Sequence, residues 1–153
     1  HQDLRNANFQ EAYLPGANFE GANLRGANFQ GANLRSVRFR GAQLAWANFS
    51  QADLIWADFQ QAELQGTNFQ QATLRGATFV RAQIRGGNFS SSDCSWADFQ
   101  DTDLYESDFQ QANLNGTTFL NAQTAGANFQ SSLGHHKSST TDSSPLSGNQ
   151  LFP

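Results

Sequence analysis

A five-residue word, repeated without interruption, restricts what this chain can fold into. The word occurs 26 times from Leu4 to Phe129 with no insertion, and its centre is nearly always a large apolar residue. The residue two places before the centre is small, the residue just before the centre is most often Asn or Asp, and the two that follow are polar or Gly. Because five is the period of neither a helix nor a strand, the repeat itself must define the fold.

The word alternates apolar, polar, apolar over three residues, which is the pattern of a short extended segment with two side chains on one face. The two residues that follow cannot face inward, so they form a corner. Glycine fits the second corner position, where a type II turn needs a positive φ. Ten of the 13 glycines stand there: Gly16, Gly21, Gly26, Gly31, Gly41, Gly66, Gly76, Gly86, Gly116 and Gly126.

Leu and Phe alternate at the centres from Leu4 to Phe79 and nearly so beyond it. A coil with an even number of walls keeps like residues above one another, and four right-angle corners close a square, although the pattern leaves other closures open. Four walls would stack two opposite Phe columns with Leu columns between them. They would also align Asn8, Asn28, Asn48, Asn68, Asn88 and Asn128 in one column, broken only by Asp108, where a ladder of side-chain amides is expected.

The tandem word A-(N/D)-(L/F)-x-x resembles the repeat of the pentapeptide repeat family. That resemblance implies an all-β fold, a right-handed quadrilateral β-helix with four pentapeptides per coil. Residues 1–130 would form about six and a half coils. Residues 131–153 lack the word and are rich in Ser and Thr, so we expect a partly capping or disordered tail. Leu133, Leu146, Leu151 and Phe152 are the residues there that could cover the last coil.

The sequence offers no candidate for catalysis. Cys94 occupies a centre in a Leu column and is expected to be a buried, inert thiol. His135 and His136 have no Cys or carboxylate partners at ligand spacing, so we expect no metal site. Cofactor motifs are absent from the sequence, and no apolar run is long enough for a membrane span.

Charge is divided unevenly along the expected rod. Residues 1–85 carry a net charge of +2 and residues 86–153 a net charge of −6. Four acids spaced five apart would place one carboxylate on each wall, and two more would complete an acidic belt. The belt consists of Asp93, Asp98, Asp101, Asp103, Glu106 and Asp108. It is either a solvated rim or, by resemblance to family members that imitate duplex DNA, a surface that binds a type II topoisomerase.

Three tryptophans, Trp46, Trp56 and Trp96, occupy corner positions where Gly, Gln or Ser usually stands. In a four-word coil Trp56 and Trp96 share a column, and Arg35, Ile55 and Arg75 form the column beside it. Exposed aromatic residues flanked by Arg are typical of protein interfaces. The alternative is that the indole rings lie over neighbouring glycines and only shield the backbone.

These observations predict a non-enzymatic scaffold or protein-binding module that presents a rigid rod surface to another protein. No direct binding of nucleic acid is expected. The alternative is a DNA mimic that binds a type II topoisomerase.

Overall fold

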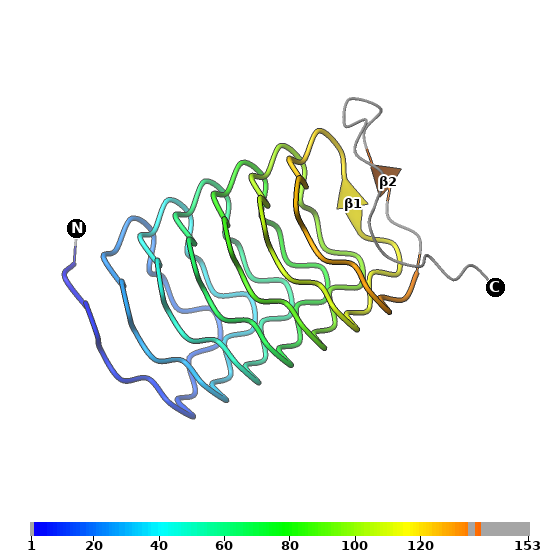
Figure 1. Ribbon diagram of the computed structural model, residues 1–153. Coiled ribbons are helices and arrows are strands. Elements are labelled where there is room, and N and C mark those ends of the chain that lie inside the picture. The colour runs from blue at the N-terminus through cyan, green and yellow to red at the C-terminus, as the bar shows by residue number, and fades with distance from the viewer. Residues whose placement is uncertain (1, 135–136, 139–153) are drawn as a thin grey trace.

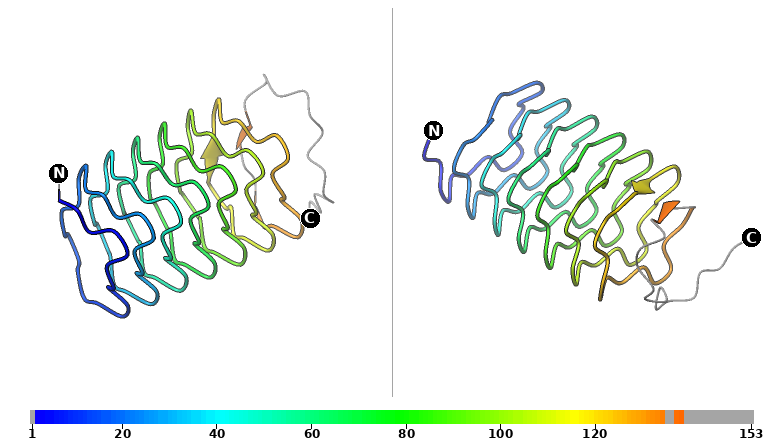
Figure 2. Two further views of the ribbon diagram at one scale, coloured as in Figure 1. Left: turned by 60° about the vertical axis from the view of Figure 1, so that its left-hand side comes forward. Right: turned by 90° about the horizontal axis from the view of Figure 1, so that it is seen from above.

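The computed structural model describes residues 2–134, 137 and 138, and in these residues the chain winds coil upon coil into a rod (Figure 1). Figure 2 shows the same coils from two further sides, with the first and last coils at opposite ends. Every isolated parallel bridge among the described residues joins positions 20 apart, as between Asn28 and Asn48. Four words therefore make one coil. Helix is absent from the described residues, in keeping with the predicted all-β class.

Each wall is held by two backbone hydrogen bonds per word. In one wall the N–H of Phe29 donates to the carbonyl of Asn48 at 2.7 Å, and the N–H of Asn48 donates to Ala27 at 2.9 Å. Only three residues separate successive corners, so nearly all walls form a single bridge. Two segments are longer than a single bridge and count as strands, β1 (Thr118–Phe119) and β2 (Lys137–Ser138), and they pair in parallel.

Where Asn or Asp stands just before the centre of a word, its side chain stabilises the corner that follows. The Oδ1 atom of Asn48 accepts the backbone N–H of Ser50 at 3.0 Å, and Asp58 accepts that of Gln60 at 2.9 Å. An oxygen one carbon beyond Cβ reaches the N–H two residues on, which explains why short polar residues dominate this position.

The second residue of each corner has the positive φ that the glycines predict, but at most corners this residue is not glycine. The second corner position has a positive φ in all ten predicted glycines and in 16 other residues. Among these are Trp46 at 63°, Trp56 at 59° and Trp96 at 62°. A hydrogen bond from the Ala57 N–H to the Leu54 carbonyl, 3.0 Å long, closes the corner around Trp56. The coil therefore imposes this conformation on residues that ordinarily avoid it, at about 1–2 kcal/mol each.

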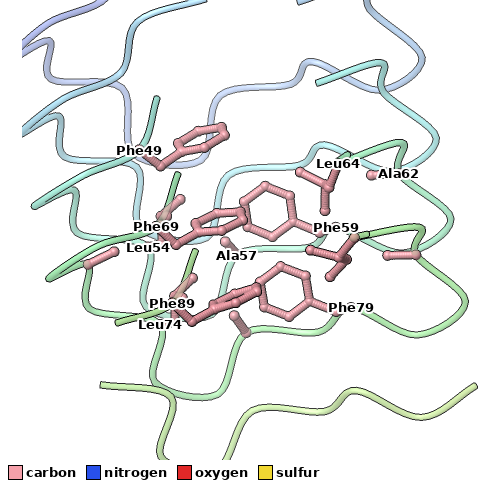
Figure 3. Packing of buried hydrophobic residues seen from close by; sticks show 14 of the residues in the cluster. Phe49, Leu54, Ala57, Phe59, Ala62, Leu64, Phe69, Leu74, Phe79 and Phe89 are labelled. Carbon is pink, nitrogen blue, oxygen red and sulfur yellow. The ribbon is translucent and has the colours of Figure 1, made fainter. Parts of the chain in front are cut away.

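The Phe columns fill the interior as predicted. Rings in successive coils of one column stack with centroids 4.6–5.3 Å apart, and rings from the opposite walls meet edge to face at 5.4–5.9 Å. Figure 3 shows Phe49, Phe69 and Phe89 in one stack, with Phe59 and Phe79 facing them. Offset stacked and edge-to-face rings are both favourable arrangements, so the two columns stabilise one another.

Hydroxyl groups at the small position are buried but bonded. Thr67 Oγ1 donates to the Leu44 carbonyl at 3.0 Å, and Thr102 donates to Phe79 at 2.8 Å. Each bond reaches a centre residue in the preceding coil, so Thr replaces Ala there without leaving an unpaired group.

The amide ladder is confirmed over the first four members of its column. The Nδ2 atoms of Asn28, Asn48 and Asn68 donate to the Oδ1 atoms of Asn8, Asn28 and Asn48 at 3.3–3.4 Å. At the far end Asn128 donates to Asp108 at 3.1 Å. The column therefore accepts a carboxylate in place of one amide.

Backbone pairing extends past residue 130. The Leu133 N–H donates to the Ala112 carbonyl at 2.9 Å, although the Leu133 side chain is 63% exposed. Strand β2 then pairs with β1 in a register that joins Thr118 to Lys137, one residue fewer than a full coil. The other proposed covering residues, Leu146, Leu151 and Phe152, lie outside the described residues. Phe119 and Phe129 are nonetheless buried at this end, whereas Phe9 at the other end is only partly buried.

Candidate functional site

Two of the three tryptophans lie on one corner of the rod. Because bridged positions lie one coil apart, Trp56 and Trp96 stand two coils apart on the same corner, with Gly76 between them. Trp46 is two words before Trp56, which places it on the diagonally opposite corner. The three side chains are 67–73% exposed. The structure thus brings Trp56 and Trp96 together and separates Trp46 from them.

Each indole covers a glycine of the next coil. A Cβ built on Gly76 would have three successive ring carbons of Trp56 at 2.9 Å or less, which places that position over the face of the ring. Trp96 covers Gly116 and Trp46 covers Gly66 in the same way. One face of each ring therefore shields the backbone of a glycine, as the second interpretation expects, and the other face is exposed to solvent.

The column beside this corner is electrically paired. Arg35 Nε lies 2.6 Å from Asp53 Oδ2, and Arg75 Nε lies 2.5 Å from Asp93 Oδ2. In both pairs the Arg reaches a carboxylate in the next coil. Ile55 stands between the two Arg residues and is partly buried. The guanidinium groups are thus held in place by bonds at Nε.

The ion pair between Arg75 and Asp93 shifts the pKa of both partners. The Asp93 carboxylate raises the pKa of Arg75 above its ordinary value through a side-chain hydrogen bond. Partial burial acts to raise the pKa of Asp93, but hydrogen bonds from Arg75 and Ser95 outweigh burial, and the pKa lies below its ordinary value. The pair therefore stays charged at neutral pH.

The acidic belt is distributed around the rod. Asp93, Asp98, Asp103 and Asp108 take part in four different bridge columns, one on each wall. Asp103 Oδ2 lies 2.6 Å from Arg85 Nε, and the Arg85 guanidinium lies 5.7 Å from the ring centre of Tyr105.

The corner acids of the belt are bonded or packed within it. Hydrogen bonds from Asn121 and Gln100 hold the pKa of Asp101 below its ordinary value. Glu106 packs against Gly126. Part of the belt's charge is therefore compensated locally, because Asp93 and Asp103 both pair with Arg.

Cys94 is buried, and burial raises the pKa of its thiol to about 12. A thiol with that pKa stays protonated at neutral pH, and the burial of Cys94 agrees with the sequence prediction. In the part of the chain that the structure describes, no group of three His, Cys, Asp or Glu side chains could hold a metal ion. His135 and His136 lie outside that part. Residues 2–134, 137 and 138 contain no helix, and therefore no helix that could span a membrane.

Sequence reasoning missed one feature of the Trp corner. Residues 56–60 and 96–100 have the identical sequence WADFQ, so the same residues recur at equivalent positions two coils apart. Asp58 and Asp98 therefore stand beside Trp56 and Trp96 on the adjoining wall. An exact match between two words was the signal that could have revealed this.

Two family models match this chain. One, described as pentapeptide repeats in eight copies, matches residues 3–41, and the other, described as a pentapeptide repeat region, matches residues 56–129. The chain belongs to the pentapeptide repeat family. Members of this family are generally structural or binding proteins rather than enzymes. A comparison of this pentapeptide repeat protein with curated proteins found no match.

Solved structures of other pentapeptide repeat proteins resemble this one. QnrB1, a plasmid-mediated fluoroquinolone resistance protein, is 18% identical with a TM-score of 0.53, over 85% of this chain and 71% of that one. A thylakoid lumen protein of Arabidopsis thaliana is 32% identical with a TM-score of 0.47, over 61% and 65% of the two chains. HetL of the cyanobacterium Nostoc, involved in heterocyst differentiation regulation, is 25% identical with a TM-score of 0.41, over 86% and 72%. QnrB1, whose TM-score is above 0.5, forms a right-handed quadrilateral β-helix, which is the predicted fold class.

Proposed function

We propose that this pentapeptide repeat protein is a non-enzymatic scaffold, a rigid rod of about six and a half coils that presents its surface to a partner protein. The partner contacts the corner that carries Trp56 and Trp96, with Arg35, Ile55 and Arg75 at its side. The observation that supports this surface most is the pair of outward-facing indole rings on one corner, each more than 60% exposed. Trp and Arg are the residue types that most often dominate binding energy at protein interfaces.

The surface is rigid, which reduces the cost of binding. Each indole lies on a glycine of the next coil, and each Arg is bonded at Nε to a carboxylate. Side chains that are already ordered lose less conformational entropy when a partner arrives. The arrangement is therefore suited to recognition rather than to catalysis.

The test is capture of partners from the source organism by the wild-type chain and by the double variant Trp56→Ala, Trp96→Ala. We expect the double variant to keep its melting temperature within a few degrees and to lose the captured partner. Trp46→Ala is the matched control, because it removes the same chemistry from the opposite corner. Retention of every partner by the double variant would overturn this site.

A second candidate function is mimicry of DNA toward a type II topoisomerase, which the acidic belt favours. In this function three of the belt's carboxylates that have no bonded Arg, those of Asp98, Asp101 and Asp108, would contact the enzyme. The test is inhibition of supercoiling by gyrase, followed by the triple change of these residues to Asn. Inhibition that the triple variant has lost would support mimicry, whereas absence of inhibition by the wild-type chain would exclude it.

A further inference from the structure

The two WADFQ words form a duplicated subsite on one corner of the rod. In each, the Trp side chain lies over a glycine of the next coil, Gly76 or Gly116, and an Asp follows two residues later on the adjoining wall. The two subsites repeat along the rod axis at twice the strand spacing, or about 9.6 Å. A ligand that fills both must itself repeat at nearly that distance.

Each subsite combines an apolar ring face with a carboxylate. The Oδ1 atoms of Asp58 and Asp98 accept the N–H of Gln60 and Gln100 at 2.9 Å. The Oδ2 atoms form no hydrogen bond or ion pair with any described residue. Arg38, one coil before Asp58 in the same column, lies 3.9 Å from Glu20 instead.

Charge on the other side of the corner is neutralised. Arg35 and Arg75 are bonded to Asp53 and Asp93. The carboxylate oxygens next to the indoles that have no partner among the described residues are the Oδ2 atoms of Asp58 and Asp98, and they favour a ligand that carries cations. A cation can bind the carboxylate and the face of the indole together.

The spacing distinguishes among the shapes that a peptide ligand can take. An extended β-strand returns to the same face every two residues, about 6.7 Å, and a helix returns after seven residues, about 10.5 Å. A polyproline II helix returns every three residues, or about 9.3 Å. Of the three, polyproline II matches the separation of the indoles best, and aromatic surfaces are its usual docking sites.

We propose that the Trp56–Trp96 corner binds a basic, proline-rich segment of the partner protein, in the polyproline II conformation and aligned with the rod axis. Prolines three residues apart lie on the two indoles, and basic side chains between them reach Asp58 and Asp98. This proposal rests on the proposed function and specifies the partner's chemistry.

The test is calorimetric titration of the full chain with a synthetic peptide of four Pro-Arg-Ala repeats. The comparison peptide has the same composition, but its prolines are placed so that no two are three residues apart. We expect the periodic peptide to bind about tenfold or more tightly than the comparison peptide. Equal affinity for the two peptides, or no binding of either, would overturn the proposal.

Variants locate the binding on the chain. Trp56→Ala and Trp96→Ala should each weaken binding of the periodic peptide severalfold, and Trp46→Ala should leave it unchanged. Asp58→Asn with Asp98→Asn should weaken binding and reduce its dependence on salt. The proposal would also be overturned if Trp46→Ala weakened peptide binding as much as the other two variants do. It would likewise be overturned if the chain bound an uncharged β-linked glucan through Trp56 and Trp96 and did not bind the peptide.

The outcome separates this inference from the proposed function. If the Trp56→Ala, Trp96→Ala variant loses its captured partner but the wild-type chain ignores the periodic peptide, the scaffold function stands and this partner chemistry is wrong. If the double variant keeps every partner, both are wrong.

Discussion

The Cγ2 methyl of Ile84 occupies the space that a Cβ at Gly87 would need. A Cβ built on Gly87 would lie 2.6 Å from that methyl and 3.1 Å from the Ile84 carbonyl oxygen. Gly87 has no positive φ and stands at the small position, where Ala is the commonest residue. The glycine is therefore required by packing against a β-branched neighbour rather than by backbone conformation.

We predict that Gly87→Ala alone destabilises the rod by about 1–3 kcal/mol through overpacking. The double variant Ile84→Leu, Gly87→Ala restores the Leu and Ala pairing of the other words and should recover most of that loss. Urea unfolding of the wild type, both single variants and the double variant measures the coupling. Additive effects of the two changes would contradict the packing explanation.

Gly76 and Gly86 provide a comparison in which the backbone is the same and only the neighbour differs. Both have a φ of 65°, but Trp56 covers Gly76, whereas a Cβ at Gly86 would have no neighbour within 4 Å. Gly86→Ala should cost only the backbone strain of about 1–2 kcal/mol. Gly76→Ala should cost more and should shift Trp fluorescence, because the indole must leave its position. Equal stability and unchanged spectra in both variants would show that Trp56 does not rest on Gly76.

The sequence was sufficient for the parts of the fold that repeat. The apolar and polar alternation predicted that Phe69 faces inward, and the alternation of Leu with Phe predicted the Phe columns and the amide ladder of Asn8 to Asn68. The positive φ of Trp56 could not be predicted from local propensity, because a large side chain avoids this conformation in isolation. Hydrogen bonds to neighbouring coils impose it here. The Arg35–Asp53 pair joins two successive coils, so it becomes visible only when words are compared across coils. The register of β2 falls one residue short of a full coil and lies beyond the repeat, so no periodic argument could supply it.

The ion pair between Arg75 and Asp93 should make the free energy of unfolding depend on pH, and it should weaken in acid. The pKa of Asp93 in the folded state lies below its ordinary value, so its stabilisation is present above the unfolded pKa of about 4 and is lost as pH falls through the folded value. Asp93→Asn should therefore reduce the slope of unfolding free energy against pH below about pH 4. Arg75→Gln should reduce the same slope, because it removes one of the bonds that lower the pKa. The measurement is urea unfolding at a series of pH values, and unchanged slopes in both variants would contradict the assignment.

Phe69 and Gln70 are adjacent in sequence, but one faces the interior and the other faces solvent. Phe69 is fully buried between Phe49 and Phe89, with centroids 5.2 and 4.9 Å away, while Gln70 is an exposed corner residue. Phe69→Asp removes the ring from this stack, at about 3–5 kcal/mol for the lost packing, and buries a carboxylate without a cation. Because each coil contacts only its neighbours, we expect that one change to unfold the middle of the rod. Gln70→Asp introduces the same charge one residue later and should change stability by less than about 0.5 kcal/mol. Circular dichroism during heating compares the two variants, and equal melting temperatures would show that the inward register is wrong.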